Sequence, residues 1–332
     1  MKSSLELPSA TASRERHADW LELRALQLPS SGISMREYVR DLGIGGTADA
    51  VDDEEKSDGV GLDENDICES TAEDAFLEID ERIRACGGSL GAYPFEVIDE
   101  NVLRVRRGMD KRAYSFMALL SQFGKDAGPL NSDGAKLFEE LSAQAIGTYM
   151  GRSSTSRQLE KSAGDEKLDC LVRTEVFGFP RRLLPKGFAD AVDSLCEKMG
   201  EGRGHCSRPK LPDQKDGRLD VVAWKEFPDR RQGKLIAFGQ CATGAGWADK
   251  LTELPQTTDW CTTWMDRPAV WPIRAFFVPH RVEFQEWFHT CVHGGLLFDR
   301  CRIAYLTVDI SRDLSIQLAA WSKHALRQLR GG

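Results

Sequence analysis

Two apolar segments that lie close together in the chain restrict the fold more than any other feature. Residues 218–226 (RLDVVAWKE) and 234–241 (KLIAFGQC) are rich in β-branched, aromatic and aliphatic side chains, and a short polar segment joins them. Runs of this length and composition are typical of buried β-strands, so we predict two adjacent strands. Buried strands of this kind belong to a sheet that helices cover on its faces.

The segments around these strands mix helical and strand patterns. We predict helices at 134–150, at 186–199, around Trp247, Leu251 and Leu254, and at 284–291, and strands at 273–278 and 301–308. This order predicts an α/β fold with a mixed central sheet flanked by helices. We assign it to a domain that covers residues 126–332.

Residues 1–125 are predicted to form a mainly helical accessory unit. A Ser-x-x-Glu capping box at Ser70 and Glu73 predicts the start of a helix, and the Gly/Asp/Glu-rich stretch 44–69 before it is predicted to be an acidic flexible loop. The remaining elements expected in this unit are helices at 14–27 and 114–123 and a hairpin within 93–105.

Charge is distributed unevenly along the chain. The net charge is −8, and residues 52–74 hold eleven Asp or Glu against one Lys. From residue 151 onward, 28 Lys or Arg face 23 Asp or Glu. An acidic first half and a mildly basic second half favour a polyanionic partner for the second half. A regulatory hypothesis follows, in which the acidic segment 52–74 covers the basic face until a signal displaces it.

Cysteine usage and hydropathy predict a cytoplasmic protein. The nine cysteines are odd in number and include no Cys-x-x-Cys pair, which is typical of reduced thiols. No apolar run approaches the length of a transmembrane helix, and the first residues lack the apolar stretch of a secretory signal. We therefore expect no membrane association.

Oxygen-bearing side chains stand at the ends of the two predicted strands. Asp220 begins the first strand and Gln240 lies near the end of the second. If the strands are neighbours, the two side chains could share one hard divalent cation such as Mg²⁺ or Mn²⁺. A cation held there could polarise a phosphate and activate a water molecule. The competing interpretation makes Asp220 an ordinary turn residue after Asp216 and Gly217.

With these residues the chain resembles the PD-(D/E)xK restriction-endonuclease-like superfamily over residues 133–308. That family places an Asp at the start of one strand, Glu or Gln on the next, and often a Glu on a preceding helix. Asp220, Gln240 and Glu139, which follows Phe138, match these positions. The stretch FGQCATGAGW resembles uncharacterised bacterial members of the superfamily that have Gln in place of the second acidic residue, several of which lie among phage-defence genes.

The resemblance implies a metal-dependent DNA endonuclease, with Asp220, Glu139 and Gln240 as ligands of Mg²⁺ or Mn²⁺. It also implies DNA rather than RNA as the nucleic-acid partner, a protein of a defence system as a second partner, and a homodimer. Alone, Glu139 or its neighbour Glu140 would be interpreted as a residue of a solvated helix face.

The chain departs from the family where the family has its lysine. That position, two residues after Gln240, is Ala242, and the lysine normally orients the attacking water and stabilises negative charge. We predict that Lys250 takes this role, with Lys234 and Lys225 as the alternatives. If none of them reaches the site, the chain is a catalytically inactive nuclease-like module that binds nucleic acid or a partner protein.

Three other groups of residues suggest different functions. A zinc site could use His289, Cys291 and His293 with Cys261 and Cys301, although His-x-Cys-x-His does not place all three side chains on one helix face. Cys241 and His280 could form a nucleophilic pair. The residues Trp247, Trp260, Trp264 and Trp271 could stack on unpaired bases, but we favour a packed core for them.

Overall fold

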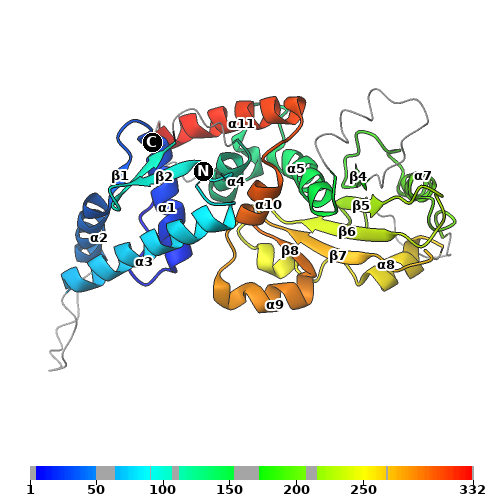
Figure 1. Ribbon diagram of the computed structural model, residues 1–332, viewed down its shortest axis with the longest axis horizontal. Helices are drawn as coiled ribbons and strands as arrows, with labels where there is room; N and C mark the ends of the chain where they lie inside the picture. The colour runs from blue at the N-terminus through cyan, green and yellow to red at the C-terminus, as the bar shows by residue number, and fades with distance from the viewer. Residues whose placement is uncertain are drawn as a thin grey trace.

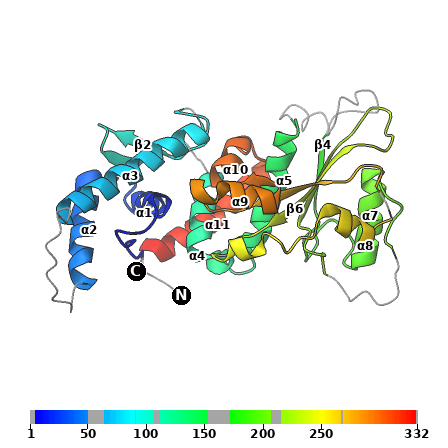
Figure 2. The same cartoon turned by 90° about the horizontal axis from the view of Figure 1, so that it is seen from below.

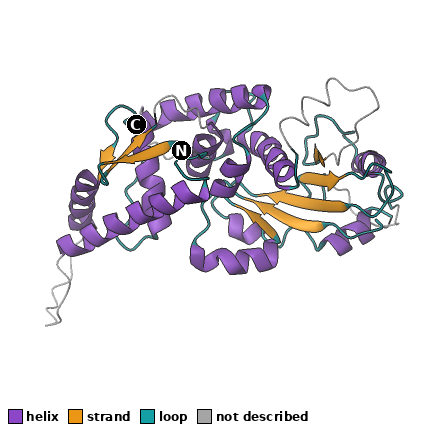
Figure 3. Cartoon of the chain, in the orientation of Figure 1, coloured by secondary structure: helices purple, strands orange, loops and turns teal. Residues whose placement is uncertain are grey.

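The computed structural model describes residues 5–49, 64–89, 91–106, 112–152, 172–206, 215–266 and 268–330. In these residues the protein has ten α-helices, a five-stranded mixed sheet and a three-stranded antiparallel sheet (Figure 1, Figure 3). The predicted α/β class with a mixed central sheet is therefore confirmed.

The five-stranded sheet changes strand direction at its centre. Its spatial order is β4 (Val172–Val176), β5 (Val221–Lys225), β6 (Leu235–Cys241), β7 (Ile273–Phe277) and β8 (Leu296–Phe298). Pairing is antiparallel from β4 to β6 and parallel from β6 to β8. A short connection returns the chain from β5 to β6, whereas the parallel β6–β7 pair needs a longer crossover, which contains a helix.

Both faces of β5 and β6 are buried, which explains their continuous apolar sequence. Alternation along each strand sends Val221 and Ala237 into a first core and Val222 and Phe238 into a second. The first core also contains side chains of α5 (Gly134–Tyr149), α10 (Arg300–Leu306) and α11 (Arg312–Arg330). The second contains side chains of α7 (Phe188–Met199) and α8 (Thr257–Trp264).

The N-terminal elements lie at one end of the molecule and the large sheet at the other (Figure 1, Figure 2). They comprise α1 (Arg14–Gln27), α2 (Met35–Asp49), α3 (Glu64–Ala85), and a small sheet of β1 (Ile33–Ser34), β2 (Phe95–Ile98) and β3 (Val102–Val105). Helix α4 (Arg112–Phe123) lies between these elements and the large sheet. Beside β7 and β8 lies α9 (Phe284–Gly294). The C-terminal α11 packs along α4, so the last helix of the chain contacts the first half of the sequence.

A buried ionic network joins α1, α3 and α10. Arg82 of α3 contacts Asp19 at 2.7 Å, Glu22 at 2.8 Å and Glu78 at 2.9 Å. Arg300, the first residue of α10, contacts Asp19 at 2.7 Å. Both arginine side chains are buried and each meets at least two carboxylates. We refer to these five residues as the ionic network.

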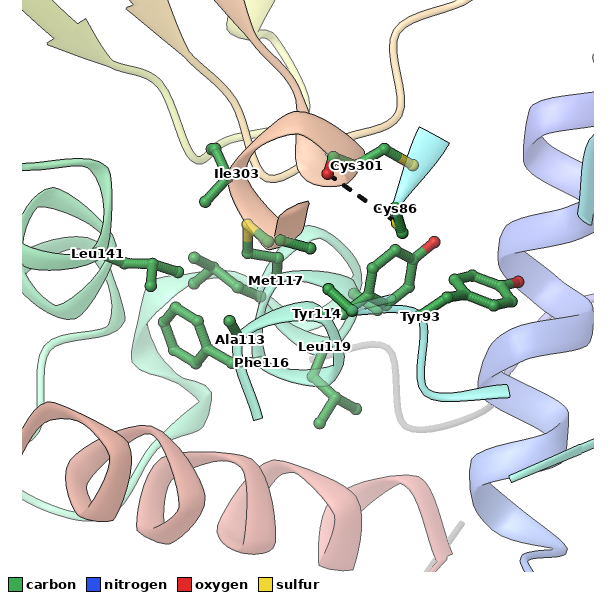
Figure 4. Close-up of a cluster of buried hydrophobic side chains, with 14 of the residues drawn as sticks. Cys86, Tyr93, Ala113, Tyr114, Phe116, Met117, Leu119, Leu141, Cys301 and Ile303 are labelled. Carbon is green, nitrogen blue, oxygen red and sulfur yellow. Dashed lines mark hydrogen bonds between the residues drawn. The ribbon is translucent and has the colours of Figure 1, made fainter. Parts of the chain in front are cut away.

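A cluster of buried side chains packs beside this network (Figure 4). The hydroxyl groups of Tyr93 and Tyr114 each donate a 2.7 Å hydrogen bond to Glu22, and the thiol of Cys86 contacts the carbonyl oxygen of Cys301 at 3.9 Å. The cluster includes residues from both sides of the predicted boundary at residue 125. The division into 1–125 and 126–332 stays a prediction.

The predicted start of the third helix was wrong. The helix begins at Glu64, six residues before Ser70, and the capping-box residues lie inside it. The hydroxyl of Thr71 donates to the carbonyl oxygen of Ile67 at 2.8 Å, so its hydrogen bond is made within the helix rather than at its end. The predicted acidic loop is correspondingly wrong at 44–49 and 64–69, which are helical, while 50–63 lie outside the described residues.

Two elements near the C-terminus also differ from prediction. Residues 301–306, predicted as a strand, belong to helix α10, because the side chain of Asp299 caps it by accepting a hydrogen bond from the Arg302 amide at 3.0 Å. The strand lies just before this cap, as β8. The helix predicted around Trp247 is only a single 3₁₀ turn, η2 (Trp247–Lys250). In the part of the chain that is described, no helix is both long and apolar enough to span a bilayer.

Candidate functional site

Two carboxylates from separate elements meet above Gly178. Glu139 projects from the second turn of α5, and Asp220 directly precedes β5. A Cβ atom placed on Gly178 would lie 2.6 Å from Glu139 Oε2 and 2.9 Å from Asp220 Oδ1. These two distances put the oxygens no more than about 5.5 Å apart. We call Glu139 and Asp220 the carboxylate pair.

Backbone hydrogen bonds from both neighbouring strands hold Asp220 in place. Its amide donates to the Gly239 carbonyl at 2.9 Å, and its carbonyl accepts from Phe177 at 2.7 Å and from Gly178 at 3.1 Å. Its Oδ2 accepts from the amide of Cys241 at 2.8 Å. One carboxylate oxygen is thus fixed to the end of β6, and the other lies near Gly178 and Glu139.

The pKa values of both carboxyl groups in the carboxylate pair lie above their usual range. Burial is the main cause that raises the pKa of Glu139 to about 8, and the nearby charge of Asp220 raises it further, while Lys136 opposes the shift. Burial likewise raises the pKa of Asp220 to about 7, with Asp216 adding to the effect and the Cys241 amide, Lys136 and Lys250 opposing it. Like charges held together away from water account for both shifts.

A lysine that the sequence analysis did not select lies in this site. Lys136 Nζ is 2.7 Å from Glu139 Oε2 and 3.0 Å from Oε1, and the Lys136 charge also acts on Asp220. Its position three residues before Glu139 on the same helix face is a signal that could have identified it. Helix α5 therefore supplies both an acidic and a basic group to the site.

The three lysines considered from the sequence occupy different surroundings. Lys250, on η2, is half-buried and close enough to lower the pKa of Asp220. Lys234 is buried and bound to the Met199 carbonyl at 2.6 Å and to Glu226 at 2.7 Å. The amine of Lys225 donates to the carbonyl of Met150 at 3.3 Å. Of these three, Lys250 is the one whose charge acts on the carboxylate pair.

Gln240 is buried, and its hydrogen bonds connect it to the loop after η2. Its Oε1 accepts from the Leu254 amide at 3.1 Å, and its Nε2 donates to Glu253 at 3.4 Å. Leu254 belongs to the second core, whereas Cys241, the next residue of β6, packs against the first core. Strand alternation thus places the Gln240 side chain on the face away from α5, while the Asp220 carboxylate approaches Glu139 of α5. The structure therefore does not bring Gln240 together with the carboxylate pair, as its predicted role as a ligand of the same cation requires.

Ala242 is fully buried in a third core with Phe276 and Leu297. A lysine at this position would have to bring its ammonium group out of an apolar environment. Position 242, where the resembling superfamily has its lysine, is therefore part of the packing in this chain.

The donor set of the carboxylate pair fits a magnesium-type cation. No cluster of three or more His, Cys, Asp or Glu suited to a metal ion occurs in the ranges that the structure describes. Mg²⁺ commonly takes only one or two carboxylates from a protein and completes its coordination with water and phosphate oxygens. Glu139 and Asp220 provide two hard oxygen ligands that a dication would help to deprotonate.

The competing groups are arranged differently. On α9 the rings of His289 and His293 lie 4.4 Å apart, but Cys291 packs toward the third core. Burial is the main cause that raises the pKa of the Cys241 thiol well above its usual range and lowers the pKa of His280 to about 4, which does not favour a thiolate–imidazolium pair.

The four tryptophans of the predicted cluster are divided between core and surface. Trp260 is fully buried in the second core and Trp264 is nearly so, as the packing interpretation predicted. Trp247 packs against the third core, and Trp271 is 46% exposed. The cluster is therefore not a common platform for stacking on bases.

Comparison with known proteins gives no relative: no protein-family model, no curated protein and no solved structure matches the chain.

Proposed function

We propose that this protein is a cytoplasmic, Mg²⁺- or Mn²⁺-dependent endonuclease that hydrolyses phosphodiester bonds in DNA, with a core of the PD-(D/E)xK type. One observation carries the proposal: Glu139 from a helix and Asp220 from the start of a strand meet above Gly178 with raised pKa values. Strongly shifted carboxyl groups held together in a buried site are typical of functional sites. The order helical Glu, strand Asp, adjacent strand also supports the proposal.

Each residue of the site has a separate task in this proposal. Glu139 and Asp220 would hold the cation, which would polarise the scissile phosphate and lower the pKa of an attacking water. Lys136 orients the Glu139 carboxylate and supplies positive charge beside Asp220. Lys250 adds a second positive charge, and Gln240 positions the loop after the turn that bears Lys250. The two lysines together replace the lysine that the family has at position 242.

Plasmid nicking tests this function. Wild-type protein with Mg²⁺ or Mn²⁺ is compared with Asp220→Asn, Glu139→Gln and the control Glu197→Gln, which changes an exposed carboxylate on α7. We expect the wild type and the control to nick DNA, and both site variants to lose at least about 100-fold in rate. Equal nicking by all four proteins, or none by the wild type with either metal on supercoiled, linear and single-stranded DNA, would overturn the proposal.

The buried Ala242 favours a second candidate function, that of a catalytically inactive module. In that case the protein binds nucleic acid or a partner protein without cutting. Salt-sensitive DNA binding with no cleavage under any of these conditions would support it, because phosphate contacts by Lys and Arg weaken as salt rises.

A further inference from the structure

A cavity of about 610 Å³ lies beside the carboxylate pair. Lys136, which contacts Glu139, is part of its lining, and so are Pro180, Arg182 and Leu183 of the loop that follows Gly178. The cavity and the carboxylate pair therefore share a wall. Cavities of roughly 300–1,000 Å³ hold ligands of small-molecule size, so this one can hold a nucleotide but not a duplex.

The walls of this cavity combine positive charge with apolar surface. Lys136, Arg152 and Arg182 supply cationic groups, Glu140 and Glu175 supply acidic ones, and Ala143, Val176 and Leu183 supply apolar ones. Arg182 pairs with Glu140 at 2.7 Å, and Glu175 pairs at 2.7 Å with Lys198, which is not part of the lining. Leu183 is 83% exposed, although it is an aliphatic residue at the rim of a cavity. A phosphate group matches the cations, and the face of a base matches the apolar surface.

Phe179, which directly precedes the cavity residue Pro180, adds an exposed aromatic ring next to the cavity lining. The ring is 41% exposed and lies one residue from Gly178, above which the carboxylate pair meets. Arg181 and Lys215 each approach its centroid to 6.0 Å. The loop is fastened there, because Arg181 donates to the Lys215 carbonyl and the Phe179 amide donates to Asp216 at 3.4 Å.

From this arrangement we propose that the site takes single-stranded nucleic acid, with one unpaired base stacking at Phe179 and Leu183 and the backbone running past Lys136 and Arg182 to the carboxylate pair. An exposed aromatic ring among cations is the combination that binds unpaired strands. A base inside a duplex would have to leave the stack to enter the cavity. The cleavage of the bound strand, though not its binding, rests on the proposed nuclease function.

Fluorescence anisotropy tests the inference without any cleavage. Fluorescein-labelled dT15, rU15 and a 15-base-pair duplex are titrated with protein in EDTA. We expect both single strands to bind at least about tenfold more tightly than the duplex, and the better of the two identifies the preferred sugar. Phe179→Ala should weaken single-strand binding at least about fivefold, and Phe179→Trp should retain it.

The control variant is Phe284→Ala, which removes an exposed ring from α9 and should bind like the wild type. A duplex that binds as tightly as dT15 and rU15, or a Phe179→Ala protein that binds like Phe284→Ala, would overturn the inference. Because binding is measured without metal, this failure is distinct from the loss of nicking that would overturn the proposed function.

Discussion

The ionic network around Arg82 and the carboxylate pair above Gly178 both hold acidic side chains away from water, but they balance the charge differently. In the network, burial alone would raise the pKa of Asp19, yet Arg300 and Arg82 hold it well below its usual range. In the pair, burial and the neighbouring carboxylate together raise the pKa of Glu139 to about 8, which Lys136 does not offset. Two arginines thus compensate the carboxylates of the network, whereas the carboxylate pair is only partly compensated by Lys136.

On the basis of this difference we assign a structural role to the network and propose a functional one for the carboxylate pair. A compensated network joins α1, α3 and α10 without needing anything further. Two buried carboxylates with too little positive charge beside them lower the stability of the fold. Such destabilising groups are typical of sites that bind a ligand. A dication would supply the positive charge that the pair lacks.

The largest effect is expected from breaking the network. Arg82→Met removes the 2.8 Å partner of the fully buried Glu22 and one arginine contact each from Asp19 and Glu78, which should lower the free energy of unfolding by about 3–5 kcal/mol. The measurement is urea denaturation, with Arg231→Met as the control because Arg231 is exposed and its contact with Asp229 is 3.9 Å long. Equal stability of the two variants would show that the network is not compensated in the way described.

Removing the positive charge from the site comes next. Lys136→Met should lower the nicking rate by about 100-fold, because it removes the ammonium group that contacts Glu139 and acts on Asp220. Lys225→Met serves as the control, since Lys225 contacts the Met150 carbonyl instead. Equally fast nicking by both variants would contradict a role for Lys136 in the site, and Lys250 would then be the remaining candidate for the positive charge.

Closing the space between the two carboxylates should have a smaller effect. Gly178→Ala places a methyl group 2.6 Å from Glu139 Oε2 and 2.9 Å from Asp220 Oδ1, so one of the oxygens must move. We expect affinity for Mn²⁺ to fall by about tenfold. The matched control is Gly43→Ala, because Gly43 is helical and has open space around it. Gly88 would not serve as a control, because its φ of +79° would strain an alanine. Equal Mn²⁺ affinity in the two Ala variants would contradict the shared site.

The smallest effect concerns stability and pH. The folded pair binds protons up to pH 7–8, whereas unfolded Asp and Glu lose theirs near pH 4, so the native state binds more protons between these values. Stability should therefore fall as pH rises from about 4 to 8. Glu139→Gln removes part of this slope and should stabilise the protein by at least about 1 kcal/mol at pH 8, with little change at pH 4.5. Urea midpoints at both pH values measure this, and an unchanged slope would contradict the raised pKa.

The sequence predicted which segments form the two central strands, and the position of Asp220 follows from them. The apolar runs around Val221 and Phe238 located β5 and β6, and thereby the neighbourhood of Asp220. Gln240 follows the strand alternation, whereas Asp220 precedes its strand and turns its carboxylate toward α5. The separation of these two side chains could therefore not be predicted. Spacing along the chain does not show such a turn.

Other misses have local causes. Lys136 was not predicted because the pattern of the resembling superfamily places the lysine at position 242. In this chain that position is a fully buried alanine of the third core. Residues 301–306 have an apolar pattern that fits a strand as well as a short helix, and the Asp299 cap decides between them. The start of α3 was misplaced because a capping-box spacing also occurs inside helices, where Thr71 bonds back to Ile67.

The most direct test of the carboxylate pair is isothermal titration of the protein with Mn²⁺ at pH 7.5. We predict one binding site in the wild type and in Glu197→Gln, and at least about tenfold weaker binding in both Glu139→Gln and Asp220→Asn. Binding of Mn²⁺ that neither substitution weakens, or no binding by the wild type, would contradict the claim that these two residues form a shared cation site.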